Sequence, residues 1–350
     1  LGLGAYTYQV ARLYPLLVVL AILYYTLSRG RFTRRDLGNL LIVGLVALVV
    51  FVPLGYYFAT HPGSFFQRVE QTAIISAEND LAGNLRAVAG ALVDTLLSFG
   101  IRGDLEPTTN LPGRPTLNGF LAVLLVAGVV ISLLRIKRPA YLFLLTWLLL
   151  MIVPALLSQF GPIAKRVIGA FPAVMVLIAV GTLAPLEMLS RWAAGRRSAF
   201  GRVAMVVLTV VLLLGFVYTA VLTYNDYFVV WAGDPDLFTH FEVGPTSVGQ
   251  YVRTLPPEER IYVSPLSPDH PSVVYNAHMR PGIKGYDGRA CIVIPEQTQA
   301  DTAYVIVPRE DPHSLELLPV YFPQGAFAAE GPRHYERPYY LTFQVPAGST

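Results

Sequence analysis

Residues 38–59, GNLLIVGLVALVVFVPLGYYFA, form an apolar run of 22 residues without a charged side chain. A helix needs roughly 20 predominantly apolar residues to cross the hydrocarbon core of a bilayer, so this run predicts a membrane span. It lacks the alternation of apolar and polar residues that a barrel strand shows. It is therefore expected to be a helix, which pairs its backbone groups within itself. Five further runs of similar character occupy residues 5–27, 117–134, 139–157, 167–186 and 203–222. The sequence predicts an α-helical polytopic membrane bundle of six transmembrane helices over residues 1–223.

The composition supports an integral membrane protein with a separate polar part. Hydrophobic residues make up 54% of the chain and charged residues 14%, and the mean hydropathy is +0.51, all far from the averages of soluble domains. Residues 1–223 carry 18 bases and 8 acids, whereas residues 224–350 carry 8 bases and 15 acids. An acidic, proline-rich C-terminal region gives no reason to expect nucleic-acid binding.

Basic residues in the short loops predict the orientation of the bundle. They follow the first, third and fifth predicted spans, and short loops rich in Lys and Arg stay in the cytoplasm. The outer loop 60–116, the loop 158–166 and the whole of 224–350 are then extracytoplasmic. The bases concerned are Arg29, Arg31, Arg34, Arg35, Arg135, Lys137, Arg138, Arg191, Arg196, Arg197 and Arg202.

The outer loop 60–116 contains two predicted helices. Ser64 begins a capping-box pattern that predicts a short helix through about Ile75. Apolar residues then recur at steps of three and four from Leu81 to Phe99, with Gly100 as a stop, and predict an amphipathic helix. Such a helix lies at the membrane surface or covers the bundle; packing against the C-terminal domain is an equally open alternative.

Residues 224–350 predict a small extracytoplasmic mixed α/β domain, large enough for a core of its own. A helix is expected over residues 247–255. Short buried strands are expected at 261–263, 273–275, 291–294 and 304–307, and residues 339–345 are strand-like.

Several common kinds of active site lack support. The sequence holds no phosphate-binding loop, no His-Glu-x-x-His and no Gly-x-Ser-x-Gly motif. Asp234-Pro-Asp236 resembles the Asp-x-Asp motif that binds a metal-bound nucleotide. Its proline and its position in a turn favour a helix cap or a loop instead. The histidines show no metal-ligand spacing, so a metal site is not supported, and the single Cys291 excludes an internal disulfide.

The strongest candidate site is the basic pair Lys165 and Arg166, which directly precedes a span on the side where bases are otherwise scarce. A lipid-linked phosphate would lie at this depth and suits a guanidinium fork and an ammonium charge; snorkelling to lipid headgroups is the alternative. Arg12 is a third candidate for phosphate binding. It is preceded by Tyr6, Tyr8 and Gln9. In a helix Tyr8 and Arg12 would lie on the same face, and that face would line a cavity or make a structural contact.

Four segments together resemble bacterial membrane glycosyltransferases of the protein-mannosyltransferase and aminoarabinose-transferase type, which belong to the GT-C superfamily. The likeness is one of arrangement and short motifs, spread over nearly the whole chain. The segments are GLGAYTYQVARLYP (2–15), NLPGRPTLN (110–118), KRVIGAFP (165–172) and GYDGR (285–289).

The resemblance implies an enzyme that moves a hexosyl or pentosyl group from a polyprenyl-phosphate-linked donor to an extracytoplasmic lipid, glycan or protein acceptor, in the inner membrane of a bacterium. Lys165, Arg166 and Arg12 match the region that approaches the carrier phosphate, and Tyr6, Tyr8 and Gln9 match a cavity-lining segment. Only the later half of the family pattern is covered. The catalytic acid is therefore expected upstream of Leu1, and Glu70, Glu78 and Asp80 are not expected to replace it.

Two other functional classes remain open at this point. A polytopic transporter or lipid flippase would bind a headgroup at the same basic residues without forming a bond. A non-catalytic membrane sensor or assembly protein would bind its partner through the C-terminal domain. An inverted second copy of the hydropathy pattern upstream would favour transport, and a cytoplasmic output domain would favour a sensor.

Overall fold

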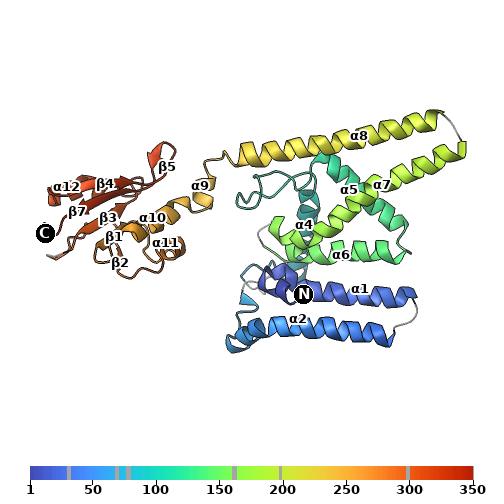
Figure 1. The fold of residues 1–350 in the computed structure, drawn as a ribbon, viewed down its shortest axis with the longest axis horizontal. Helices are drawn as coiled ribbons and strands as arrows, with labels where there is room; N and C mark the ends of the chain where they lie inside the picture. Colours follow the sequence, from blue (N-terminus) through green and yellow to red (C-terminus); the bar gives the residue numbers. More distant parts are fainter. Residues whose placement is uncertain are drawn as a thin grey trace. The chain divides into compact units, whose positions relative to one another are not determined.

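A computed structural model of the chain describes residues 1–29, 33–67, 71–75, 80–159, 164–196, 199–296 and 300–349. The chain divides into two compact units, Leu1–Trp231 and Ala232–Thr350. Figure 1 shows the first unit as a set of long helices and the second as a small sheet with helices. Each unit is described by itself below.

The first unit is helical and holds most of the apolar runs. Its α-helices are α1 (Tyr14–Arg29), α2 (Arg34–Thr60), α4 (Leu81–Ser98), α5 (Gly119–Leu134), α6 (Pro139–Leu156), α7 (Phe171–Arg196) and α8 (Ala199–Tyr224). Five helical segments among the described residues are long and apolar enough to cross a membrane, namely Gln9–Thr26, Arg34–Thr60, Pro139–Leu156, Ala164–Ala194 and Phe200–Trp231. These helices indicate a membrane protein, as predicted. The remaining predicted span coincides with the apolar helix α5, which has 16 residues.

Helix α2 shows why the first unit needs an apolar solvent. A capping box between Thr33 and Asp36 starts the helix. None of its 27 residues is buried, and side chains such as Leu41 and Val49 are more than 60% exposed. An apolar surface of this extent does not face water in a soluble protein. Lipid is its natural surrounding.

Glycines allow α5 and α7 to cross at the centre of the first unit. A Cβ atom at Gly128 would overlap the carbonyl oxygen of Leu177, and one at Gly181 would overlap the carbonyl oxygen of Leu124. Close backbone approach through small residues is the usual way in which membrane helices associate. The side chains of Leu177 and Val174 are fully buried beside this crossing.

The predicted span at 5–27 is not one continuous α-helix. Leu3–Tyr6 and Gln9–Leu13 form separate 3-10 turns, and the α-helix begins only at Tyr14. Tyr8 between them is extended, with φ −131° and ψ 149°. Pro15 lies in the first turn of α1, where its missing amide is tolerated, and its ring disfavours an α-helical turn just before it because it clashes with the carbonyl four residues earlier. The prediction that Tyr8 and Arg12 share a helical face is therefore wrong.

The loop 60–116 partly matches its prediction. Helix α4 confirms the amphipathic helix, and Asp80 caps it by accepting a hydrogen bond from the amide of Gly83 at 2.7 Å. Ser64–Phe66 form a turn where a helix was expected, and Ala73 forms an isolated β-bridge with Ser158. Part of that predicted helix, residues 68–70, lies outside the described residues, as do Arg31 and Arg197.

The second unit is a mixed α/β structure around one five-stranded sheet of order β2-β1-β3-β7-β4. The first three strands in this order are parallel, and β7 pairs antiparallel with both β3 and β4. The strands are β1 (Arg260–Ser264), β2 (Ile283–Gly285), β3 (Thr302–Ile306), β4 (Ala326–Glu330) and β7 (Leu341–Val345), with a small hairpin of β5 (Arg333–His334) and β6 (Arg337–Pro338). The helices are α9 (Leu237–His240), α10 (Val243–Thr254), α11 (Pro271–Asn276) and α12 (Pro312–Tyr321).

Four of the predicted elements in this unit are confirmed, and two are wrong. The confirmed elements are α10, β1, β3 and β7. Residues 273–275, where a strand was expected, belong to helix α11. This helix begins at Pro271 and is capped by the side chain of His270. Residues 291–294 are irregular instead of forming a strand, and the Tyr304 hydroxyl donates to the Val293 carbonyl at 2.7 Å.

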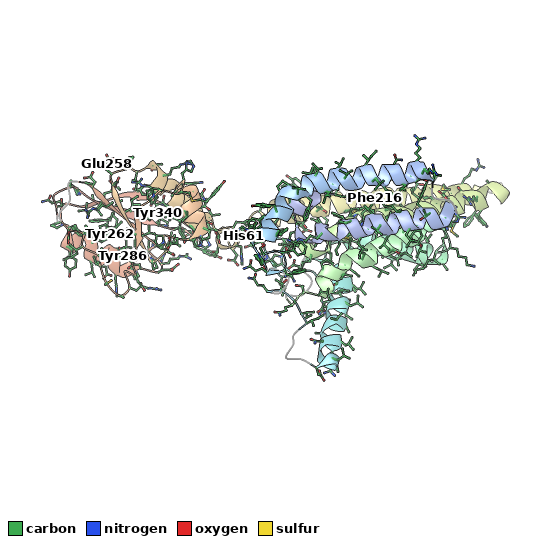
Figure 2. The ribbon with its side chains drawn as sticks, turned by 90° about the horizontal axis from the view of Figure 1, so that it is seen from below. His61, Phe216, Glu258, Tyr262, Tyr286 and Tyr340 are labelled. Atoms are coloured by element: carbon green, nitrogen blue, oxygen red, sulfur yellow. The ribbon has the colours of Figure 1, made fainter. Side chains whose placement is uncertain are left out.

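The sheet separates two hydrophobic layers. Mostly aliphatic side chains, among them Val248 and Val263, fill one side. Aromatic rings fill the other, where Tyr262 stacks on Tyr304 with ring centroids 5.4 Å apart. Figure 2 labels Tyr262 within this unit. The alternation of side chains along each strand gives the sheet these two packed faces.

Candidate functional site

A cavity of about 280 Å³ with several polar groups in an otherwise apolar lining lies in the first unit, and we call it the arginine cavity. It is bounded by Gln9–Leu13, by the turn at Phe65 and Phe66 and by the end of α6. Its polar lining consists of Tyr8, Gln9, Arg12, Thr72, Ser158 and Arg166. Four of the residues that the sequence singled out therefore meet around one space, although they come from segments more than 140 positions apart.

Two loops join to form one wall of the cavity. The amide of Gln159 donates to the Thr72 carbonyl at 2.9 Å, and the amide of Ile74 donates to the Leu157 carbonyl at 2.9 Å. These backbone bonds flank the bridge between Ala73 and Ser158. Backbone pairing satisfies polar groups that would otherwise be costly near lipid.

Ser158 offers a hydroxyl group to the cavity. Its side chain is 3% exposed, and among the described residues its Oγ atom has no hydrogen-bond partner. A buried hydroxyl without a partner costs free energy, so such atoms usually meet water or a ligand. Ser158 therefore suits a polar ligand group in the arginine cavity.

Arg12 is held by its surroundings in a fixed orientation. Its Nη1 atom donates to the Phe65 carbonyl at 2.6 Å. The guanidinium carbon lies 4.2 Å from the centre of the Phe65 ring and 5.4 Å from that of Phe58. Aromatic faces attract a cation, more so away from water. A pre-oriented guanidinium loses little entropy when it binds an anion.

Arg166 belongs to a 3-10 segment, Ala164–Ala170, that precedes α7. Trp147 donates from Nε1 to the Gly169 carbonyl at 2.9 Å, which fixes this segment against α6. The amide of Ala164 donates to the buried carboxylate of Asp104 at 2.9 Å. Lys165 is exposed and lies outside the lining of the arginine cavity. The segment thus directs one of the two predicted bases into the cavity.

An apolar groove of about 490 Å³ adjoins the arginine cavity, and we call it the α1–α2 groove. Its lining from α1 and α2 is aliphatic or aromatic, for example Val19 and Leu48. Arg12 and Phe65 line both the groove and the cavity. The two adjoining spaces together offer an apolar surface and two guanidinium groups, which suits an amphiphile with an anionic head.

Tyr6 has a structural position. Its hydroxyl donates to the Val50 carbonyl at 2.8 Å and accepts from the Leu54 amide at 3.2 Å. These two backbone groups are one helical turn apart and flank Pro53 in α2. Tyr6 is not among the residues that line the arginine cavity.

Asp104 is a site residue that the sequence did not reveal. Its carboxylate accepts from the Thr109 hydroxyl at 2.7 Å and the Glu106 amide at 2.5 Å, besides the Ala164 amide. It is 6% exposed. An acidic residue in the loop 60–116 carries no sequence signal for this role, because its contact with the Ala164 amide joins residues 60 positions apart.

The segment 110–118 of the family resemblance has a structural role in the first unit. Arg114 forms an ion pair with Asp226. Asn110 accepts from the Tyr227 hydroxyl at 2.7 Å, and the Trp231 ring nitrogen donates to the Pro107 carbonyl at 3.1 Å. The loop is thereby attached to the π-helix Asn225–Trp231 at the end of α8.

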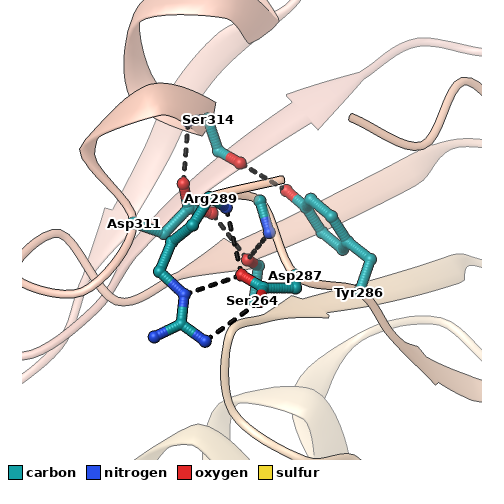
Figure 3. Close-up of polar contacts among 7 residues, drawn as sticks. Ser264, Tyr286, Asp287, Arg289, Asp311 and Ser314 are labelled. Atoms are coloured by element: carbon teal, nitrogen blue, oxygen red, sulfur yellow. Dashed lines mark hydrogen bonds and ion pairs between the residues drawn. The ribbon is translucent and has the colours of Figure 1, made fainter. Parts of the chain in front are cut away.

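The segment 285–289 forms a buried polar network in the second unit (Figure 3). Ser264 donates to Asp311 at 2.6 Å and accepts from the Gly288 amide at 2.9 Å. The Tyr286 and Ser314 hydroxyls are 2.9 Å apart, and burial raises the pKa of Tyr286 to about 12. Only glycine fits at position 288, since a Cβ there would overlap Asp311. These groups satisfy one another, which is typical of a structural network.

The remaining candidates add no metal site. Asp234 accepts from the amide of Asp236 at 2.9 Å within a turn, whereas Asp236 accepts from the Tyr335 hydroxyl at 2.5 Å and makes no side-chain cap to α9. Within the described ranges, no group of three or more His, Cys, Asp and Glu residues is placed to hold a metal ion.

The chain was compared with protein-family models, with curated proteins and with solved structures. No family model, curated protein or solved structure matches it. The arginine cavity and the α1–α2 groove are therefore the basis for a functional inference.

Proposed function

We propose that this protein is a membrane glycosyltransferase that moves a sugar from a polyprenyl-phosphate-linked donor to an extracytoplasmic acceptor. The observation that carries the proposal is the shared lining of the arginine cavity and the α1–α2 groove by Arg12 and Phe65. A polyprenyl phosphate has a long apolar tail and an anionic head, and this site offers a partner to each. The proposed setting is a bacterial inner membrane, with six spans, the arginine-rich loops in the cytoplasm and the second unit outside.

The proposed chemistry breaks the bond between the sugar's anomeric carbon and the carrier phosphate oxygen. The acceptor oxygen forms the new bond to that carbon, its proton passes to a base, and the phosphate leaves with the bonding electron pair. We assign this base to no residue of the chain. Arg12 and Arg166 would stabilise the negative charge that develops on the phosphate, because preorganised cations act strongly in a partly dry site.

Replacement of Arg166 by glutamine tests the site. Loss of a hydrogen bond to a charged group costs about 1.5–3 kcal/mol, which corresponds to roughly 10- to 100-fold weaker binding. We expect Arg166→Gln to weaken binding of undecaprenyl phosphate by this factor, measured by native mass spectrometry of the full chain in detergent. Lys165→Gln should have a smaller effect, because the Lys165 side chain is exposed.

Arg102→Gln is the matched control. Arg102 pairs with Asp94, and its side chain is 63% exposed, so removal of its charge should leave the affinity within about twofold, as expected for exposed pairs. Equal affinities of the wild type and Arg166→Gln would contradict the proposed site.

Transfer itself is tested in proteoliposomes with radiolabelled hexosyl- and pentosyl-phosphopolyprenols. A labelled product in which the sugar has left the carrier supports the transferase, and Arg166→Gln should reduce its formation at least tenfold. Movement of the intact labelled lipid between leaflets without product supports the flippase instead. Binding without either reaction by the full-length protein would leave the lipid site intact and contradict the assigned reaction.

A further inference from the structure

Helix α4 presents part of its apolar side outward. Leu81, Leu85 and Leu96 are 77%, 62% and 55% exposed, and at steps of four and seven they lie on one side of the helix together with Leu92. We call these four leucines the leucine stripe. A helix that packed on the bundle through its apolar side would bury them.

The adjoining side of α4 faces the rest of the first unit, where Thr95, Ser98 and Phe99 are buried and Val88 is half-buried. The stripe is left uncovered beside this contact, whereas a surface helix in a soluble protein turns its apolar side to the core. The leucine stripe therefore needs a partner outside the first unit.

The direction of α4 indicates which partner this is. Figure 2 shows α4 projecting from the bundle and running across the direction of α1 and α2. The chain connects α4 to the end of α2 on one side and to the start of α5 on the other, so it lies at the ends of these apolar helices. A helix that runs across the spans at their ends lies in the plane of the membrane interface.

The charges of α4 favour lipid tails over an oppositely charged partner. Asp80, Arg86, Asp94 and Arg102 are the charged residues of the helix and its two ends within residues 80–102, and they sum to zero. Arg86 lies beside the stripe on the exposed surface, where a guanidinium can remain at headgroup level.

We propose that α4 is an interfacial anchor whose leucine stripe inserts into the acyl region of the membrane. The anchor is also connected to the segment that carries Arg166 of the arginine cavity. The loop that follows α4 contains Asp104, whose carboxylate holds the amide before Lys165 and Arg166. The depth of α4 in the interface then helps to set the depth of Arg166 relative to lipid headgroups. This inference concerns lipid contact and does not depend on glycosyl transfer.

Spin labels on the full chain in nanodiscs test the anchor. Cys291 is the only cysteine, so Cys291→Ala gives a background for single labels at Leu85→Cys or Leu96→Cys, with Arg86→Cys as the matched control one residue from the stripe. We expect the accessibility to oxygen relative to a water-soluble nickel complex to be several-fold higher at 85 and 96 than at 86. The same result is expected in phosphatidylcholine alone and with phosphatidylglycerol added.

Each other outcome would overturn the proposal in a recognisable way. High access of the nickel complex at 85 and 96 would place the stripe in water. Immobile labels with low access to both reagents would mean that protein covers the stripe. Dipolar broadening between labels on separate copies would identify that protein as a second chain. Wild-type elution in size-exclusion chromatography shows that each labelled variant is folded.

Discussion

Replacement of Gly181 by alanine is expected to destabilise the first unit severely. A Cβ at this position would overlap the Leu124 carbonyl oxygen and lie 2.9 Å from the Gly128 amide nitrogen. Neither contact involves a flexible side chain, so α5 and α7 must move apart. Overpacking of a well-packed core costs about 1–3 kcal/mol and occasionally more, and we expect a value at or above the upper end.

Gly38→Ala provides the matched control for this substitution. A Cβ at Gly38 in α2 meets nothing within 4 Å, and alanine is favoured over glycine in a helix by roughly 1 kcal/mol. The same exchange should therefore lower the thermal midpoint at 181 and maintain or raise it at 38, measured on the purified chain in detergent. Equal midpoints for the two variants would show that α5 and α7 do not approach as closely as the structure has them.

Removal of Arg114 is expected to cost about as much. Arg114 forms its ion pair with Asp226, whose side chain is 8% exposed. Loss of one partner leaves the other charge buried without compensation, at a cost of about 3–5 kcal/mol. Arg114→Met should lower the thermal midpoint sharply and expose the Trp231 ring, which a shift of tryptophan emission would report.

Two comparisons separate the buried pair from a general charge effect. Arg102→Met breaks the exposed pair with Asp94, for which about 0–1 kcal/mol is expected. In the double variant Arg114→Met/Asp226→Leu both charges are absent, and an apolar pair of similar size often restores stability. If Arg102→Met were as harmful as Arg114→Met, burial of the second pair would not be the cause.

Local sequence patterns predicted an element correctly where the segment itself determines its structure. Helix α4 follows from its apolar period and α2 from its length. The patterns failed where a single residue or a contact with a distant part of the chain determines the structure. The extended backbone at Tyr8 interrupts the predicted span at 5–27, and the apolar run 273–275 is too short to separate a strand from a helix. Orientation and the number of spans stay predictions.

The candidate site could be predicted only in part for the same reason. Charge placement singled out Arg12 and Arg166, and the fold brings them to one cavity. Ser158, Phe65 and Asp104 gave no signal, because each owes its role to residues far away in the sequence. The α1–α2 groove belongs to two helices whose spacing no local pattern encodes.

The attachment of α2 has a consequence for the way a lipid would reach the groove. Tyr6 ties α2 to the N-terminal segment beside Pro53, and Gly2 packs against the Ala47 carbonyl, which lies 2.5 Å from where its Cβ would be. The first contact lies on the half of α2 nearer Thr60 and the second lies at the middle of the helix. Toward Arg34 the groove is bordered by Leu40 and Val43, and α2 buries no residue. A long lipid tail would enter the groove laterally from the bilayer, at the end of α2 nearer Arg34. Its head group would then meet Arg12 without passing through water.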